Sequence, residues 1–194
     1  MQNLPNSDLH LTEYNSKILQ MYLNHLVQYP DAQVLDLGPV CKENIMFFAK
    51  RVKKLSACDM FFRIDRHLRK GLSTEKVWNH LNYQPRSFHG IHLWDFIDHI
   101  GDNDAVKVAE LCHTMLKPNG MLLAISFNEH SILSKINSFV IQDNYRIILR
   151  HQPHLDLPWY YRNIRTLTSI LSAFTPVKSF LYRNGFREML FCRH

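Results

Sequence analysis

Residues 92–99, which read His-Leu-Trp-Asp-Phe-Ile-Asp-His, hold the densest group of side chains that could do chemistry. Asp95 or His99 is a candidate general base, because either can take a proton from a reacting group. The rings of Trp94 and Phe96 can flank a positive charge with their faces. The alternative is structural: the acids would cap a helix or lie at the surface, and the histidine would be a hydrogen-bond partner of one of them. The one argument for a catalytic role is the position of these residues near the end of a predicted strand.

A second group of residues could hold a cofactor. The run Val-Leu-Asp-Leu-Gly at 34–38 ends in Gly38, and a glycine after a strand lets a ligand approach the backbone closely. The start of the following helix presents free N–H groups to an anion, and Lys42 beside it can pair with a bound carboxylate. Asp59 comes 23 residues after Asp36, at the end of the next strand, where an acid can accept both hydroxyls of a ribose. The alternative is a core strand followed by a turn.

A third group, Leu-Pro-Trp-Tyr-Tyr-Arg-Asn-Ile-Arg at 157–165, combines aromatic rings with guanidinium groups. This composition suits a substrate lid, a surface on which bases stack, or a protein interface. As a lid, Tyr160 and Arg162 would close over the strand ends. The alternative, an amphipathic helix that packs its rings on the sheet, is as well supported as the others together.

Metal ligation and two common catalytic motifs are disfavoured. His151, His154 and Asp156 fall in one predicted loop and could hold zinc, but a loop that happens to be rich in histidine explains them better without a fourth ligand. We therefore predict no metal site. The chain has neither a Gly-x-Ser-x-Gly nucleophile elbow nor a Gly-x-x-x-x-Gly-Lys phosphate loop.

The composition predicts a single domain. The chain has 194 residues, of which 46% are hydrophobic, and we expect an N-terminal helical segment at 1–30 and an α/β core at 31–194. The longest apolar runs fall short of the ~18–20 residues that cross a bilayer, so we expect no membrane span. The four cysteines form no Cys-x-x-Cys pair, which disfavours disulfides and zinc knuckles and favours the cytoplasm.

The net charge of +6 is unevenly distributed along the chain. Residues 42–70 hold nine Lys and Arg against three acids, and residues 146–194 hold eight against two. Such basic segments are one signature of association with nucleic acid. Solvated helix faces and strand edges are the simpler explanation.

Buried strands alternate with helices in the first two thirds of the chain. We predict strands at 32–38, 54–60, 88–96 and 121–127, and helices at 13–29, 43–52, 73–81 and 102–117. No strand can be identified with assurance between residues 60 and 87. The alternating order is typical of a doubly wound, mostly parallel sheet.

The last third of the chain has a different pattern. We predict an added strand at 145–150, an amphipathic helix at 160–174, and two strands within 177–193 that Asn184-Gly185 joins in a tight turn. The fold class predicted for the whole chain is therefore α/β, with a doubly wound, mostly parallel sheet that ends in an antiparallel C-terminal hairpin.

The ordered set of motifs resembles the class I S-adenosylmethionine-dependent methyltransferases, a Rossmann-like family. The resemblance is carried by residues 34–38, Asp59, residues 88–100, the run Leu-Lys-Pro-Asn-Gly-Met-Leu-Leu-Ala-Ile-Ser at 116–126, and the terminal hairpin. It covers roughly residues 30–194.

The resemblance implies a cofactor and an activity. S-adenosylmethionine would be bound by five residues at the strand ends: Asp36, Gly38, Lys42, Asp59 and Trp94. The methyl acceptor, a small molecule, would lie near the end of the fourth strand, with Asp95 or His99 as the base and with Tyr160 and Arg162 over the substrate.

One departure from the family pattern keeps an alternative open. The family's first motif usually carries two or three glycines, whereas this chain has Gly38 followed by Pro39 and Val40. The alternative is a catalytically inactive binding or scaffold protein with a methyltransferase-like fold, which could associate with nucleic acid through the basic segments.

Overall fold

The computed structural model describes residues 13–127, 135–183 and 185–194. The first part of the chain contains β1 (Glu13–Asn15), α1 (Lys17–Leu26), β2 (Gln33–Asp36), α2 (Lys42–Ala49), β3 (Lys54–Ala57), α3 (Met60–Arg69), the 3-10 helix η2 (Thr74–Leu81) and β4 (Phe88–Trp94). The second part contains the 3-10 helix η3 (Phe96–His99), α4 (Asp102–Met115), β5 (Leu116–Phe127), β6 (Asn137–Ile141), the 3-10 turn η4 (Asp143–Tyr145), β7 (Arg146–His151), α5 (Ile164–Ile170), β8 (Thr175–Leu181) and β9 (Phe186–Cys192).

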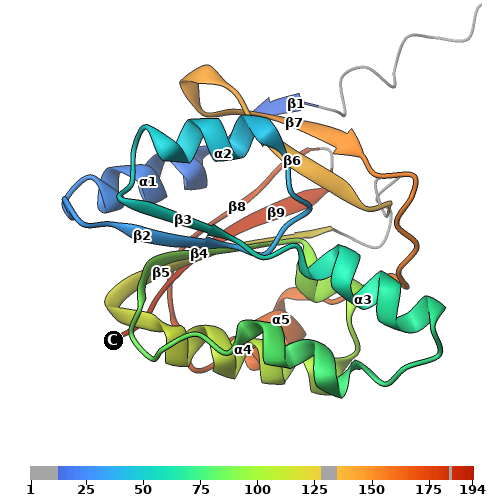
Figure 1. Ribbon diagram of the computed structural model, residues 1–194. Helices are drawn as coiled ribbons and strands as arrows, with labels where there is room; N and C mark the ends of the chain where they lie inside the picture. The colour runs from blue at the N-terminus through green and yellow to red at the C-terminus, as the bar shows by residue number, and fades with distance from the viewer. Residues whose placement is uncertain (1–12, 128–134, 184) are drawn as a thin grey trace, which may run out of the picture.

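The central sheet has six strands in the order β3-β2-β4-β5-β9-β8 (Figure 1). The first four are parallel, and β9 runs antiparallel to both of its neighbours. This arrangement confirms the predicted fold class. The hairpin residue Asn184 lies outside the described residues, and Gly185 after it has φ +89°, a left-handed conformation that glycine adopts without strain.

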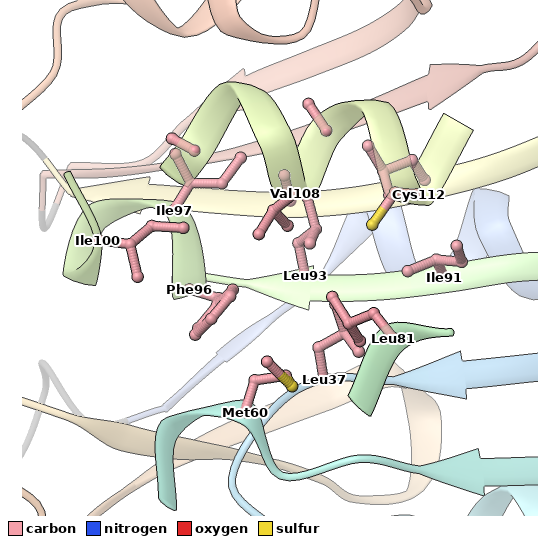
Figure 2. Close-up of a cluster of buried hydrophobic side chains, with 14 of the residues drawn as sticks. Leu37, Met60, Leu81, Ile91, Leu93, Phe96, Ile97, Ile100, Val108 and Cys112 are labelled. Atoms are coloured by element: carbon pink, nitrogen blue, oxygen red, sulfur yellow. The ribbon is translucent and has the colours of Figure 1, made fainter. Parts of the chain in front are cut away.

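Helices cover both faces of this sheet, so its central strands are buried on both sides. In β4 every residue is buried, and alternate side chains point to opposite faces. Ile91 and Leu93 pack against α3, α4 and η2 in one apolar cluster (Figure 2). His92 and Trp94 point to the other face, where α1 and α2 lie (Figure 1).

A second, smaller sheet lies on the α1 and α2 side of the molecule (Figure 1). It has three antiparallel strands in the order β1-β7-β6. The predicted strand at 145–150 is found as β7, but it pairs in this second sheet and not in the central one. The buried amide of Asn44 in α2 fastens β6, because it donates to the carbonyl of Phe139 at 2.9 Å and accepts from the N–H of Ile141 at 2.8 Å.

The structure settles one point that the sequence left open and differs from two sequence-based expectations. Residues 61–87 form α3 and η2 and contain no strand, so the described central sheet ends at β3. The helical periodicity of residues 43–52 predicts that Ile45 and Phe48 face inward, but Ile45 is 40% exposed, because α2 turns Asn44 and Phe48 to the core. The helix expected at 160–174 is shorter and begins after Asn163, whose side chain accepts from the N–H of Thr166.

None of the helices in the described ranges is both long enough and apolar enough to cross a membrane.

Candidate functional site at the strand ends

The carboxyl ends of β2 and β4 lie side by side. Asp36 at the end of β2 pairs in register with His92 of β4, and Trp94 ends β4 two residues later. In open α/β sheets, this edge is where ligands bind. The structure therefore brings Asp36, Gly38 and Trp94 together, as the sequence predicts.

The indole of Trp94 occupies the space between these strand ends. Its Nε1–H donates to Oδ1 of Asp36 at 2.7 Å, and the side chain is only 2% exposed. The same Oδ1 also accepts from the N–H of Gly38 at 2.9 Å. Trp94 itself has φ +52°, a left-handed conformation that is rare for a bulky residue and that costs of order 1–3 kcal/mol.

Gly38 allows close approach, but the approaching group belongs to the chain itself. A Cβ at Gly38 would lie 2.8 Å from Nε1 of Trp94 and closer still to Cδ1 of the same ring. Any larger residue would therefore collide with the indole. The backbone that a ligand would need at this position is already in contact with a tryptophan.

The second sheet covers the other side of the indole. The ring of Phe139 in β6 stacks on Trp94, with 5.2 Å between the centroids and 3° between the planes. Phe139 lay outside every motif recognised in the sequence. The one signal for it is the apolar run Phe-Val-Ile at 139–141, which forms the last three residues of β6.

Asp59 uses both carboxylate oxygens within the protein. Oδ1 accepts from the N–H of Phe62 at 2.9 Å and so caps α3, and Oδ2 accepts from the N–H of Val40 at 3.1 Å. Burial raises the pKa of this carboxyl, although both hydrogen bonds oppose the rise. Lys42 is exposed at the first turn of α2, and Cys41 before it makes no side-chain cap.

The predicted acid–base residues come together, but in the interior. Asp95, Asp98 and His99 are fully buried, and Nε2 of His99 lies 3.4 Å from Oδ2 of Asp95. Asp98 accepts from the N–H of Phe127 at 3.0 Å and from the hydroxyl of Ser126 at 3.4 Å, so it joins η3, which follows β4, to the end of β5.

Burial sets the titration of this cluster. It raises the pKa of Asp98 to about 7, against the weaker opposing effect of the Phe127 N–H. Burial alone would lower the pKa of His99, but the hydrogen bond and negative charge of Asp95 outweigh it, and the pKa of His99 is raised. Both Asp98 and His99 therefore favour their protonated forms.

The segment at 157–165, for which a lid was one of several interpretations, is anchored in the protein. Arg162 is buried, and its guanidinium donates to the carbonyls of Ile97 and Ile100 at 2.6 and 2.7 Å and pairs with Asp102 at 2.7 Å. Tyr160 is 41% exposed, and its N–H donates to the carbonyl of Asp98. Of the two predicted substrate residues, Arg162 therefore anchors this segment, and Tyr160 places its ring at the surface.

A buried glutamate was also missed by the sequence analysis. Glu188 in β9 accepts from the hydroxyls of Tyr14 and Tyr182, each at 2.8 Å, and burial raises its pKa. These bonds tie β1 of the second sheet to the C-terminal hairpin. Nothing local in the sequence marks this residue, because its partners lie up to 174 positions away.

Two cavities in the described ranges are not lined by any residue of the predicted cofactor set. One of about 600 Å³ lies between α1, α2 and η4 and is lined in part by Leu23, Phe47 and Tyr145. One of about 210 Å³ lies near the ends of β5 and β9. The predicted substrate residue Arg162 lines the smaller cavity, beside Ser126 and Phe127 at the carboxyl end of β5.

The residues present do not fit S-adenosylmethionine as they stand. The cofactor would need open backbone at Gly38 and a free acid for its ribose. The indole of Trp94 fills the first place, and each carboxylate oxygen of Asp59 already accepts from a backbone N–H group. In the described ranges, no three or more His, Cys, Asp or Glu side chains gather closely enough to hold a metal ion.

Comparison with known proteins gives likenesses of structure alone. No protein-family model matches the chain, and no curated protein matches it in sequence. The N-methyltransferase NodS from Bradyrhizobium japonicum WM9 is 13% identical, and the match covers 90% of this chain and 93% of that one with a TM-score of 0.53.

Two other solved structures widen the comparison. The 1,6-didemethyltoxoflavin-N1-methyltransferase of Burkholderia thailandensis, solved with 1,6-didemethyltoxoflavin and S-adenosylhomocysteine bound, is 14% identical over 91% of this chain and 78% of that one, with a TM-score of 0.50. The cyclase SpnF is 10% identical over 91% and 80%, with a TM-score of 0.55. At these identities the likeness shows a common fold, which is that of the class I S-adenosylmethionine-dependent methyltransferases.

Proposed function

We propose that this protein is a non-catalytic binding or scaffold protein built on the methyltransferase fold. One observation carries the proposal: the indole of Trp94 lies against Gly38, donates to Asp36, and is covered by Phe139. In this role the strand ends form part of the core, and recognition takes place on other surfaces.

The state of the polar residues supports the same role. A base must reach the proton that it removes, within hydrogen-bond distance or through one water. Asp95 and His99 are fully buried, and His99 also contacts the carbonyl of Pro158 at 3.2 Å. These contacts suit residues that hold the strand ends to the following segment.

A second candidate function is S-adenosylmethionine-dependent methyl transfer to a small molecule. It is favoured by the Burkholderia structure, which has this fold and contains S-adenosylhomocysteine with a small-molecule ligand. For this chain to act in that way, the indole of Trp94 would have to leave Asp36 and Gly38. The likeness to SpnF, a cyclase by name, weakens any argument from the fold to methyl transfer.

Calorimetric titration with S-adenosylhomocysteine separates the two candidates. We expect no saturable heat with the wild-type protein. Trp94→Ala removes the indole, and binding that appears only in this variant would support a site closed by the chain itself. A thermal melt of each variant shows whether it is folded.

The wild-type result alone can overturn the proposal. Saturable binding of S-adenosylhomocysteine to the wild-type protein, lost in Asp59→Ala, would favour the methyltransferase. The matched control is Asp143→Ala, because Asp143 is an exposed acid in η4, outside the strand-end site.

A further inference from the structure

A groove between α3 and η2 gathers basic and apolar side chains outside the strand-end site. We call it the α3–η2 groove; its volume is about 290 Å³, and it is lined by Phe62, Arg63, Arg66, His67, Lys70, Leu72 and His80. Its volume lies at the low end of the range for small-molecule sites, about 300–1,000 Å³.

The three cations of the groove have no acidic partner. Neither Arg63, Arg66 nor Lys70 forms an ion pair with any carboxylate in the described ranges. Arg69 on the same helix differs, because it pairs with Asp65 at 2.7 Å and donates to the carbonyl of His154. Asp65, the acid of α3, is therefore paired on the side of the helix away from the groove.

Arg63 is held in place by a histidine. Its Nη1 lies 3.1 Å from Nδ1 of His80, and since a guanidinium can only donate, Nδ1 accepts and His80 is neutral. Nε of Arg63 is enclosed and has no hydrogen-bond partner among the described residues. His67 is fixed as well, because its Nδ1 lies 3.0 Å from the carbonyl of Arg63.

The field in the groove is positive. Burial lowers the pKa of His80 first, and the charges of Arg63 and His67 lower it further. An unpaired guanidinium gains most from an oxyanion, which accepts its N–H groups in charge-assisted hydrogen bonds.

The helix dipole explains only part of this arrangement. Cations are favourable in the last turn of a helix, which accounts for Arg66 and Lys70. Arg63 lies in the first half of α3, where the dipole gives a cation no advantage. Residues 63, 66, 67 and 70 instead follow the three- and four-residue spacing of one helical face, the face that lines the groove.

Two large apolar side chains complete the groove. Phe62 is 47% exposed and Leu72 is 51% exposed, and both line it beside the cations. An apolar surface next to unpaired cations matches a ligand that carries an anionic group on an apolar or aromatic body.

We propose that the α3–η2 groove binds a small phosphate-bearing molecule with an aromatic body. Arg63, Arg66 and Lys70 receive the phosphate, and the body lies against Phe62 and Leu72. A phosphate is favoured over a carboxylate because three cations converge without a counter-ion. The inference does not rest on the proposed function, because no residue of the predicted cofactor set lines the groove.

Phenyl phosphate is the probe for the test, with the full chain in calorimetry. We expect saturable binding in the millimolar range or tighter, weakened about tenfold or more in Arg63→Gln and in Arg66→Gln. Arg69→Gln is the matched control, since it removes the same charge from the other side of α3. A proton NMR titration of His80 gives a second readout: its pKa rises when bound phosphate offsets the charge of Arg63.

Several results would overturn the proposal. The first is the absence of saturable binding, and the second is a loss of affinity in Arg69→Gln equal to that in Arg63→Gln. The third is binding of inorganic phosphate as tight as that of phenyl phosphate, which would show that the aromatic body contributes nothing to the affinity. A thymidine oligonucleotide that binds far more tightly, with a steep loss of affinity as salt rises, would assign the groove to nucleic acid instead. Saturating S-adenosylhomocysteine should leave the affinity for phenyl phosphate unchanged, which separates this inference from the strand-end site.

Discussion

Phe139 and Trp94 stack almost in parallel although they belong to different sheets, and this contact joins the small sheet to the strand ends of the large one. The stack is buried, so both rings contribute their full apolar area to the core. The contribution of the stack to the free energy of unfolding can be measured by truncating one of the two rings.

Phe139→Ala should destabilise the protein by about 3–5 kcal/mol, because it removes a buried ring and leaves a cavity beside Trp94. Chemical denaturation measures the loss. Phe62→Ala is the control: that ring is about half exposed, so the same truncation should cost far less. Equal losses in the two variants would argue against a stack that closes the site.

Asn44→Ala tests how β6 is attached to α2. The variant leaves the carbonyl of Phe139 and the N–H of Ile141 without their side-chain partner in a buried place. We expect a loss of about 2 kcal/mol in the free energy of unfolding. Asn24→Ala in α1 is the control, because Asn24 is exposed. A loss no larger than that of the control would contradict the bridging role of Asn44.

Asp98→Asn tests the pH dependence of the buried cluster. The folded pKa of Asp98, about 7, lies above the ordinary aspartate value of 3.8. Its contribution to stability is therefore fully present below about pH 4 and is lost as the pH rises through about 7. The variant lacks this titration, so the wild-type protein should lose stability relative to Asp98→Asn between these limits. Parallel curves of unfolding free energy against pH would contradict the raised pKa.

Arg162→Met distinguishes an anchor from a lid. It removes the donors to two buried carbonyls, which should cost about 3 kcal/mol of stability. Arg165→Met makes the same exchange at an exposed position of the same segment and should change stability little. A thermal melt compares the two. If Arg162→Met leaves the melting temperature unchanged, the guanidinium does not anchor this segment.

The parallel strands could be predicted from the sequence because each is a short, mostly apolar segment that lies between segments with helical periodicity. The sequence also placed Asp36, Gly38 and Trp94 together, since the carboxyl ends of parallel strands meet at one edge. The stack on Trp94 could not be predicted in this way. Phe139 lies 45 residues away on β6, a strand that was not predicted, in a sheet of which only β7 was expected.

Side-chain direction was the other gap. Ile45 was assigned to the core by its hydropathy, but the backbone groups of β6 require an amide, so α2 turns Asn44 inward. In the same way, Asp59 suits a ribose by its position, but the nearer N–H groups of Val40 and Phe62 take its oxygens. Backbone groups of the chain itself thus bind the side chain that the sequence alone would assign to a ligand.

The indole at the strand ends also acts as a tethered competitor. A ligand that enters there must first displace a ring that is always present, so its apparent affinity falls by the fraction of molecules in which the ring has moved away. If the closed state is favoured by about 2.7 kcal/mol, an otherwise intact site would bind about a hundredfold more weakly. The ratio of affinities with and without the ring of Trp94 is therefore a direct measure of the free energy of closure.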